Sequence, residues 1–209
     1  MVLLENESRY NHESERLDGE LSLVFIRGLP GSGKTTVASE MVRLIGINGV
    51  ELIDPDIIDK DSEDYSEFVR KLSQAQPELD PKFFLYRYML FRARCALLEG
   101  RSVIWDQPFS LLSGLKHAIV TTESYFQNLS EIQVIIVDLD IDPEESYKRV
   151  QDRISKGGHG PDRLTFDSFV SKYQPAECLG RNHISLSGMG SPIENAERVF
   201  EMIKCQKKD

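Results

Sequence analysis

The chain has 209 residues, a formal net charge of −9 at pH 7 and a sequence pI near 5.0. This length suits one α/β domain with a sizeable core. The acidic balance gives no overall basic field for nucleic acid or an anionic membrane, and no stretch approaches the roughly 20 apolar residues that span a bilayer. The three cysteines, Cys95, Cys178 and Cys205, are far apart and odd in number, which indicates neither a disulfide framework nor a zinc site. We therefore expect a cytoplasmic protein.

Residues 1–20 are polar and only weakly periodic, which predicts a flexible N-terminal arm ahead of a single domain over residues 21–209. The mixed charges of this arm differ from the basic and apolar regions of a secretory signal. The apolar run 21–27 then predicts a buried strand.

A glycine-rich stretch, Gly-Leu-Pro-Gly-Ser-Gly-Lys-Thr-Thr, follows this strand and satisfies G-x-x-x-x-G-K-[ST]. Glycine permits the turns by which backbone N–H groups surround phosphate oxygens, and the next helix adds its positive N-terminal end. Lys34 should reach the β- and γ-phosphates of ATP, and the Thr35 hydroxyl should bind Mg²⁺. A turn that only joins strand to helix is the alternative, which the flanking sequence disfavours. The expected nucleotide-binding residues are Gly28, Pro30, Gly31, Ser32, Gly33, Lys34, Thr35 and Thr36.

Carboxylates follow each of the next two expected strands. A strand over 50–53 ends at Asp54 and Asp56, and a strand over 102–105 ends at Asp106. Because the carboxyl ends of parallel strands meet at one edge of an open α/β sheet, these acids should face the phosphate loop. The alternatives are that Asp54 or Asp56 only caps a turn, and that Asp106 is a structural acid.

Further strands are expected over 132–137, the most apolar run and hence a central strand, and over 183–186. Helical patterns lie between the expected strands. Together they predict an α/β fold, namely a three-layer P-loop NTPase fold with a mostly parallel five-stranded sheet and a small mobile lid. The helix expected from Asp80 carries Arg87, Arg92 and Arg94, which we interpret as solvated or paired rather than as a substrate cleft.

The mobile lid is expected at about residues 154–163. Arg149 and Arg153 are four residues apart on one helix face, and glycines on both sides of His159 suit a segment that closes over a nucleotide. The two arginines could instead pair with Glu145 or Asp152 on a solvated face.

These motifs together resemble the P-loop kinases that include zeta toxins and polynucleotide kinase-like proteins. The matching residues are Gly28 to Thr36, Asp54-Pro55-Asp56, Trp105-Asp106 and Arg149-x-x-x-Arg153-x-x-x-Gly157-Gly158-His159. The resemblance implies that Asp56 takes the proton of the acceptor hydroxyl, and that Arg149 and Arg153 stabilise the transferring phosphoryl group. Polynucleotide kinase-like members usually carry an arginine shortly after this aspartate, whereas Ile57-Ile58-Asp59 follows here.

We therefore expect an ATP- and Mg²⁺-dependent kinase acting on a hydroxyl of a small metabolite, such as a nucleotide sugar or nucleoside. The expected catalytic residues are Lys34, Asp56, Arg149 and Arg153; the expected substrate contacts are Asp54, Asp106 and His159; and the expected metal contacts are Thr35 and Asp106. The alternatives are a 5′-hydroxyl nucleic-acid kinase, which a basic groove of Arg87, Arg92 and Lys116 would favour, and an ATP-hydrolysing switch protein. No membrane partner is expected.

Overall fold

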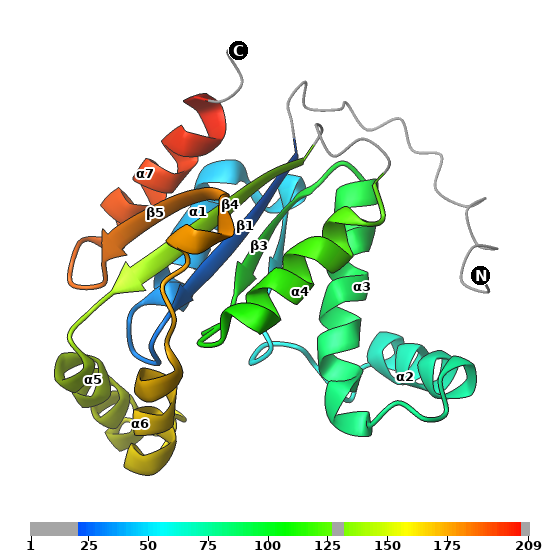
Figure 1. Cartoon of the computed structure of the whole chain (residues 1–209), viewed down its shortest axis with the longest axis horizontal. Coiled ribbons are helices and arrows are strands. Elements are labelled where there is room, and N and C mark those ends of the chain that lie inside the picture. The colour runs from blue at the N-terminus through cyan, green and yellow to red at the C-terminus, as the bar shows by residue number, and fades with distance from the viewer. Residues whose placement is uncertain (1–20, 127–131, 206–209) are drawn as a thin grey trace.

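A computed structural model describes residues 21–126 and 132–205 of the chain (Figure 1). The expected N-terminal arm, residues 1–20, lies outside these residues. Within them the chain has an α/β fold, in which helices flank a five-stranded sheet.

The sheet has the strand order β2-β3-β1-β4-β5, and every neighbouring pair is parallel. The strands are β1 (Leu21–Gly28), β2 (Val50–Ile53), β3 (Ser102–Asp106), β4 (Ile132–Asp140) and β5 (Asn182–Ser187). The prediction of a mostly parallel five-stranded sheet is thus confirmed. The middle position belongs to β1, and β4, the most apolar run, is the inner strand beside it.

Helices cover both faces of the sheet, and other helices lie outside these layers (Figure 1). Helices α1 and α7 cover one face of the sheet, and α3 and α4 cover the other. Helices α5 and α6 form an arm beyond the carboxyl ends of the strands. In the part of the chain that is described, no helix is both long and apolar enough to cross a membrane. The helices are α1 (Lys34–Ile45), α2 (Glu63–Ala75), α3 (Phe84–Leu98), α4 (Leu112–Glu123), α5 (Pro143–Ser155), α6 (Arg163–Lys172) and α7 (Pro192–Cys205).

The alternating side chains of β1 explain why this strand occupies the centre. Leu23 and Phe25 are fully buried in the core beneath α3 and α4, and Val24 and Ile26 are fully buried in the core beneath α1 and α7. Successive residues of a strand point to opposite faces, so a continuous apolar run suits a strand that is covered on both sides.

The arm is positioned by the loop that follows β1. Leu29 packs with Val150 of α5 and Phe166 of α6 in a small core of their own. The Ser146 hydroxyl donates a hydrogen bond to the Pro30 carbonyl oxygen at 2.8 Å. Helix α5 begins with a capped turn, since the Asp142 side chain accepts from the amides of the first helical turn. The arm is therefore packed directly on the loop and is not merely tethered to it.

Gly31 marks the closest approach between loop and arm. A Cβ atom at this position would lie 2.4 Å from the Ser146 carbonyl oxygen, and the residue has φ +91°. Alanine at position 31 would therefore face both a backbone collision and an unfavourable conformation.

We predict that Gly31→Ala lowers the free energy of unfolding by about 1–3 kcal/mol for the collision in addition to about 1–2 kcal/mol for the left-handed backbone. Gly180→Ala is the matched control, because Gly180 has φ +62° and nothing within 4 Å of an added Cβ. Urea unfolding of the two variants provides the comparison. Equal losses at both positions would show that the arm does not press on the loop.

Candidate active site

The expected phosphate loop connects the end of β1 to the start of α1. Gly28 to Gly33 form the connection, and Lys34, Thr35 and Thr36 form the first turn of the helix. The Ser32 amide donates to the Leu29 carbonyl oxygen at 3.0 Å, which closes the turn. The N-terminus of α1 therefore opens onto the carboxyl edge of the sheet, where it can attract an anion.

Lys34 is the charged centre of this edge. The residue is 8% exposed, and its ammonium donates to the Leu29 carbonyl oxygen at 3.0 Å. Burial lowers the pKa of Lys34, while the nearby carboxylate of Asp106 raises it. Asp54 and Asp56 also raise this pKa, and the guanidinium of Arg153 lowers it. The ammonium thus has three carboxylates and a second cation within electrostatic range.

Thr35 and Asp106, the two expected metal contacts, lie together. The Thr35 hydroxyl donates to Asp106 Oδ2 at 2.6 Å, and Asp106 is 4% exposed. Burial raises the pKa of Asp106, and the charge of Lys34 opposes that shift. The end of β3 therefore presents a carboxylate oxygen beside a hydroxyl oxygen in the first turn of α1.

Asp54 and Asp56 differ in their surroundings although only Pro55 separates them. Asp54 is buried, and its Oδ1 accepts a hydrogen bond from the Asp56 amide at 2.8 Å. Asp56 is exposed. Both act on Lys34 and on Asp106, so both face the phosphate loop as expected. Asp54 also caps the turn, which leaves Asp56 as the acid that solvent and a ligand can reach.

The oxygen atoms of this edge fit a magnesium nucleotide better than a metal held by protein alone. In the described ranges, no three His, Cys, Asp or Glu side chains are grouped closely enough to hold a metal ion. Mg²⁺ commonly uses one or two carboxylates together with substrate phosphates and water. The pair of Thr35 and Asp106 supplies such a partial set of ligands, and the excess of carboxylates over the Lys34 ammonium favours a divalent cation.

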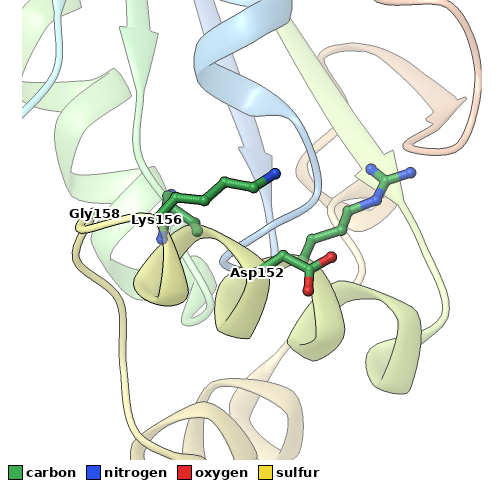
Figure 2. Close-up of a pocket in the computed structure, with 5 residues that line it drawn as sticks. Asp152, Lys156 and Gly158 are labelled. Atoms are coloured by element: carbon green, nitrogen blue, oxygen red, sulfur yellow. The ribbon is translucent and has the colours of Figure 1, made fainter.

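A basic hollow of about 510 Å³ lies along the end of α5 (Figure 2). In Figure 2 the side chains of Asp152 and Lys156 project from the last turns of α5 at this hollow. Neither residue was assigned a role from the sequence, although their helical spacing from Arg149 and Arg153 places all four on one face. The lining residues are Arg149, Asp152, Arg153, Lys156 and Gly158.

The two expected lid arginines have different neighbours. Arg153 lies within electrostatic range of Lys34. Arg149 instead donates to the Gly188 carbonyl oxygen at 2.9 Å and contacts the Met189 sulfur, in the turn after β5. Its Nε is 3.8 Å from a Glu145 carboxylate oxygen, so the expected alternative of a pair with Glu145 exists only as a loose contact. Arg153 therefore lies within electrostatic range of Lys34, while Arg149 contacts Gly188, whose backbone lies close to Ser32 of the phosphate loop.

The glycine-rich segment that follows α5 packs closely on Arg153. A Cβ at Gly158 would lie 2.7 Å from Arg153 Cγ, and one at Gly160 would lie 3.2 Å from Arg153 Nη2. These glycines thus have a packing role in addition to the mobility expected from the sequence. Between them, His159 is exposed; burial raises the pKa of Asp54, and His159 slightly opposes that rise, so the tip of the segment lies within electrostatic range of the acid at the end of β2.

The arginines of α3 do not form a basic groove. Arg87 donates to the Gln76 side chain at 3.0 Å, Arg92 pairs with Glu51, and the Arg94 guanidinium lies 4.5 Å from the Tyr125 ring centroid. The interpretation of these side chains as paired is confirmed.

The raised pKa of Asp54 leads to a stability prediction. Burial is the main cause of the raised pKa of Asp54, and repulsion by the Asp56 carboxylate raises this pKa further. A folded-state pKa above the unfolded value stabilises the fold only while the acid is protonated, and this contribution is lost as pH rises through the folded pKa. Without nucleotide or metal, we expect Asp54→Asn to be more stable than the wild type at pH 7, with a difference that shrinks as the pH falls towards 4.

Urea unfolding between pH 4 and pH 7.5 measures this difference. Asp59→Asn is the control, because exposed Asp59 makes the same kind of hydrogen bond, from the Asp61 amide at 2.9 Å. An Asp54→Asn variant that is less stable than the wild type at pH 7 would contradict the burial argument.

Comparisons with known proteins agree with this architecture. Residues 23–176 match the AAA_33 family, described as an AAA domain. No match is found among curated proteins.

Several solved kinases share the fold. A sugar kinase from Janibacter sp. HTCC2649 has a TM-score of 0.59 at 18% identity, over 88% of this chain and 95% of that one. The APS kinase of Mycobacterium tuberculosis has a TM-score of 0.54 at 18% identity, over 89% and 99%. A fungal RNA kinase has a TM-score of 0.56 at 15% identity, over 88% and 86%. The chain therefore belongs to the AAA_33 family of AAA domains, and its fold is that of the P-loop kinases.

Proposed function

We propose that this protein is an ATP-dependent phosphotransferase, similar to zeta toxins, that phosphorylates a hydroxyl of a small metabolite such as a nucleotide sugar or nucleoside. The observation that supports this most is the arrangement around Lys34. Arg153 lies within electrostatic range of the Lys34 ammonium although the two charges repel, and Asp56, just after β2, lies within the same range. Such a group of cations opposite a carboxylate is suited to a phosphoryl group that moves towards an acceptor hydroxyl.

The chain's own groups account for each part of the reaction. Backbone N–H groups of residues 31–36 and the Lys34 ammonium bind the β- and γ-phosphates. Asp56 orients the acceptor hydroxyl and takes its proton as the new oxygen–phosphorus bond forms and the bond to ADP breaks. Arg153 stabilises the charge on the transferring group. When bound, Mg²⁺ neutralises charge on the phosphate oxygens, and Thr35 and Asp106 would hold it.

Arg149 and His159 lie in different parts of the site. Arg149 is fixed beside the turn after β5, and His159 lies towards Asp54. In this proposal Arg149 steadies the nucleotide as a lid cation, and His159 and Asp54 contact the acceptor.

The main alternative acceptor is a nucleic-acid 5′-hydroxyl, since an RNA kinase shares the fold. Two observations disfavour it: Arg87 and Arg92 are occupied by Gln76 and Glu51, and no arginine closely follows Asp56. Binding of oligonucleotides that weakens steeply with salt would favour that alternative. The other alternative, an ATP-hydrolysing switch protein, would turn over ATP without an acceptor.

Asp56→Asn should lower phosphoryl transfer by about 10²- to 10⁴-fold, because the amide cannot accept the hydroxyl proton. ATP binding should stay nearly intact, since Asp56 does not form the phosphate loop. Transfer rates and ATP titration by calorimetry test both statements. Asp59→Asn is a control from the same segment. Unchanged turnover in Asp56→Asn would remove this residue from the role of base.

Arg153→Ala should lower kcat by about 10³-fold, the lower end of the range for arginines that stabilise transferring phosphoryl groups. Ground-state binding of ATP should weaken much less. Lys148→Ala is the matched control, because Lys148 is an exposed cation of α5 that does not line the hollow. Steady-state kinetics separates the two parameters. An effect confined to KM would contradict a role in the transition state.

A further inference from the structure

Arg27 is a fully buried arginine that directly precedes the phosphate loop. Its side chain is 0% exposed at the end of β1, on the sheet face that also carries Phe25. Its sequence position before Gly28 gives no reason for a charge there, since the other residues of this strand are mostly apolar. The contacts of the guanidinium explain the charge.

One set of contacts fixes the loop after β3, the strand that ends at Asp106. Arg27 Nη2 donates to the Phe109 carbonyl oxygen at 3.0 Å, and the Gln107 amide donates to the Ile26 carbonyl oxygen at 3.2 Å. Phe109 is buried and has φ +44°, the single positive φ of a non-glycine residue in the described ranges. Backbone strain of this kind persists where the surroundings strongly determine the conformation, often at functional sites.

A second set of contacts fixes the chain as it leaves the arm. Arg27 Nη2 also donates to the Gln174 carbonyl oxygen at 2.7 Å, and its guanidinium carbon lies 4.4 Å from the Tyr173 ring centroid. Gln174 is bonded in turn to the loop after β3, through its amide to the Ser110 carbonyl oxygen and through its side chain to the Leu112 amide. One guanidinium thus joins β1, the loop that begins at Asp106 and the end of the arm.

The charge of Arg27 is balanced by Asp138 of β4. Arg27 Nε lies 3.2 Å from Asp138 Oδ1, which also accepts from the Tyr173 hydroxyl at 2.7 Å, while His183 Nε2 lies 2.8 Å from Oδ2. Burial raises the pKa of Tyr173, so its hydroxyl remains a donor. Buried ion pairs contribute little stability compared with apolar residues of similar size, so stability alone does not explain this one.

We propose that Arg27 is a positioning residue for phosphoryl transfer, which holds the Asp106 loop and the arm in one fixed relation to the phosphate loop. This inference rests on the proposed function. Asp106, a metal contact in the proposed function, ends the strand that leads into the loop held by Arg27, and Arg153 lies on the arm whose exit Arg27 holds. Without the guanidinium fork, Asp106 and Arg153 are no longer held in a fixed position relative to Lys34. Mg²⁺ then increases the ATP affinity less, and phosphoryl transfer is slower. The affinity for ATP in the absence of metal depends on the phosphate loop itself and is therefore unchanged by this loss.

Arg27→Lys tests the proposal, because lysine keeps the charge but lacks the planar fork that reaches two carbonyl groups and a carboxylate. We expect turnover of Mg-ATP to fall about 10²-fold, the loss that a misplacement of about 1 Å can cause. By calorimetry, the gain in ATP affinity on adding Mg²⁺ should fall about tenfold, while the affinity for ATP without Mg²⁺ stays within threefold. Arg92→Lys is the matched control, since Arg92 pairs with Glu51 away from the site.

Urea unfolding shows whether Arg27→Lys is folded, and Tyr173→Phe is a second variant if it is not. Tyr173→Phe keeps the ring against Arg27 but loses the hydrogen bond to Asp138, and should reduce turnover and the Mg²⁺ response in the same direction to a smaller extent. Wild-type turnover and Mg²⁺ response in whichever of these variants is folded would overturn the proposal. A wild-type protein that neither binds nor turns over Mg-ATP would instead contradict the proposed function.

Discussion

The attraction between the buried Lys34 ammonium and the carboxylates around it is the interaction on which the site depends. Burial alone disfavours the charge of Lys34 and also the charges of Asp54 and Asp106. The opposite charges nearby offset part of this effect of burial, and the parallel sheet brings the groups together by ending β1, β2 and β3 at one edge. The charges of such a site are balanced only when phosphate and a divalent cation are bound.

The arm adds the second half of this charge pattern. Leu29 and Pro30 of the phosphate loop anchor α5, so the helix that carries Arg153 is positioned by the same turn that positions Lys34. Gly158 and Gly160 after α5 then lie against the Arg153 side chain. The tight packing of Gly31 on Ser146 shows that the loop and the arm form one packed unit.

Much of this arrangement could be predicted from the sequence because its signals are local. The phosphate loop and the acids at the ends of β2 and β3 each lie within a few residues of the strand or helix they belong to. The contacts of Arg27 could not be predicted in that way, since they come from Phe109, Asp138, Tyr173 and Gln174, which only the folded sheet and arm bring together. The separate neighbours of Arg149 and Arg153 escaped prediction for the same reason: one helix face meets two different parts of the fold.

Transfer of a labelled γ-phosphate from ATP tests the central claim most directly. Purified protein is incubated with Mg²⁺, labelled ATP and a panel of metabolites, nucleotide sugars, nucleosides and 5′-hydroxyl oligonucleotides. The account predicts that label moves to a hydroxyl of a small molecule and that this transfer requires Mg²⁺. Release of label only as inorganic phosphate with every acceptor, or no Mg²⁺-dependent turnover at all, would contradict it.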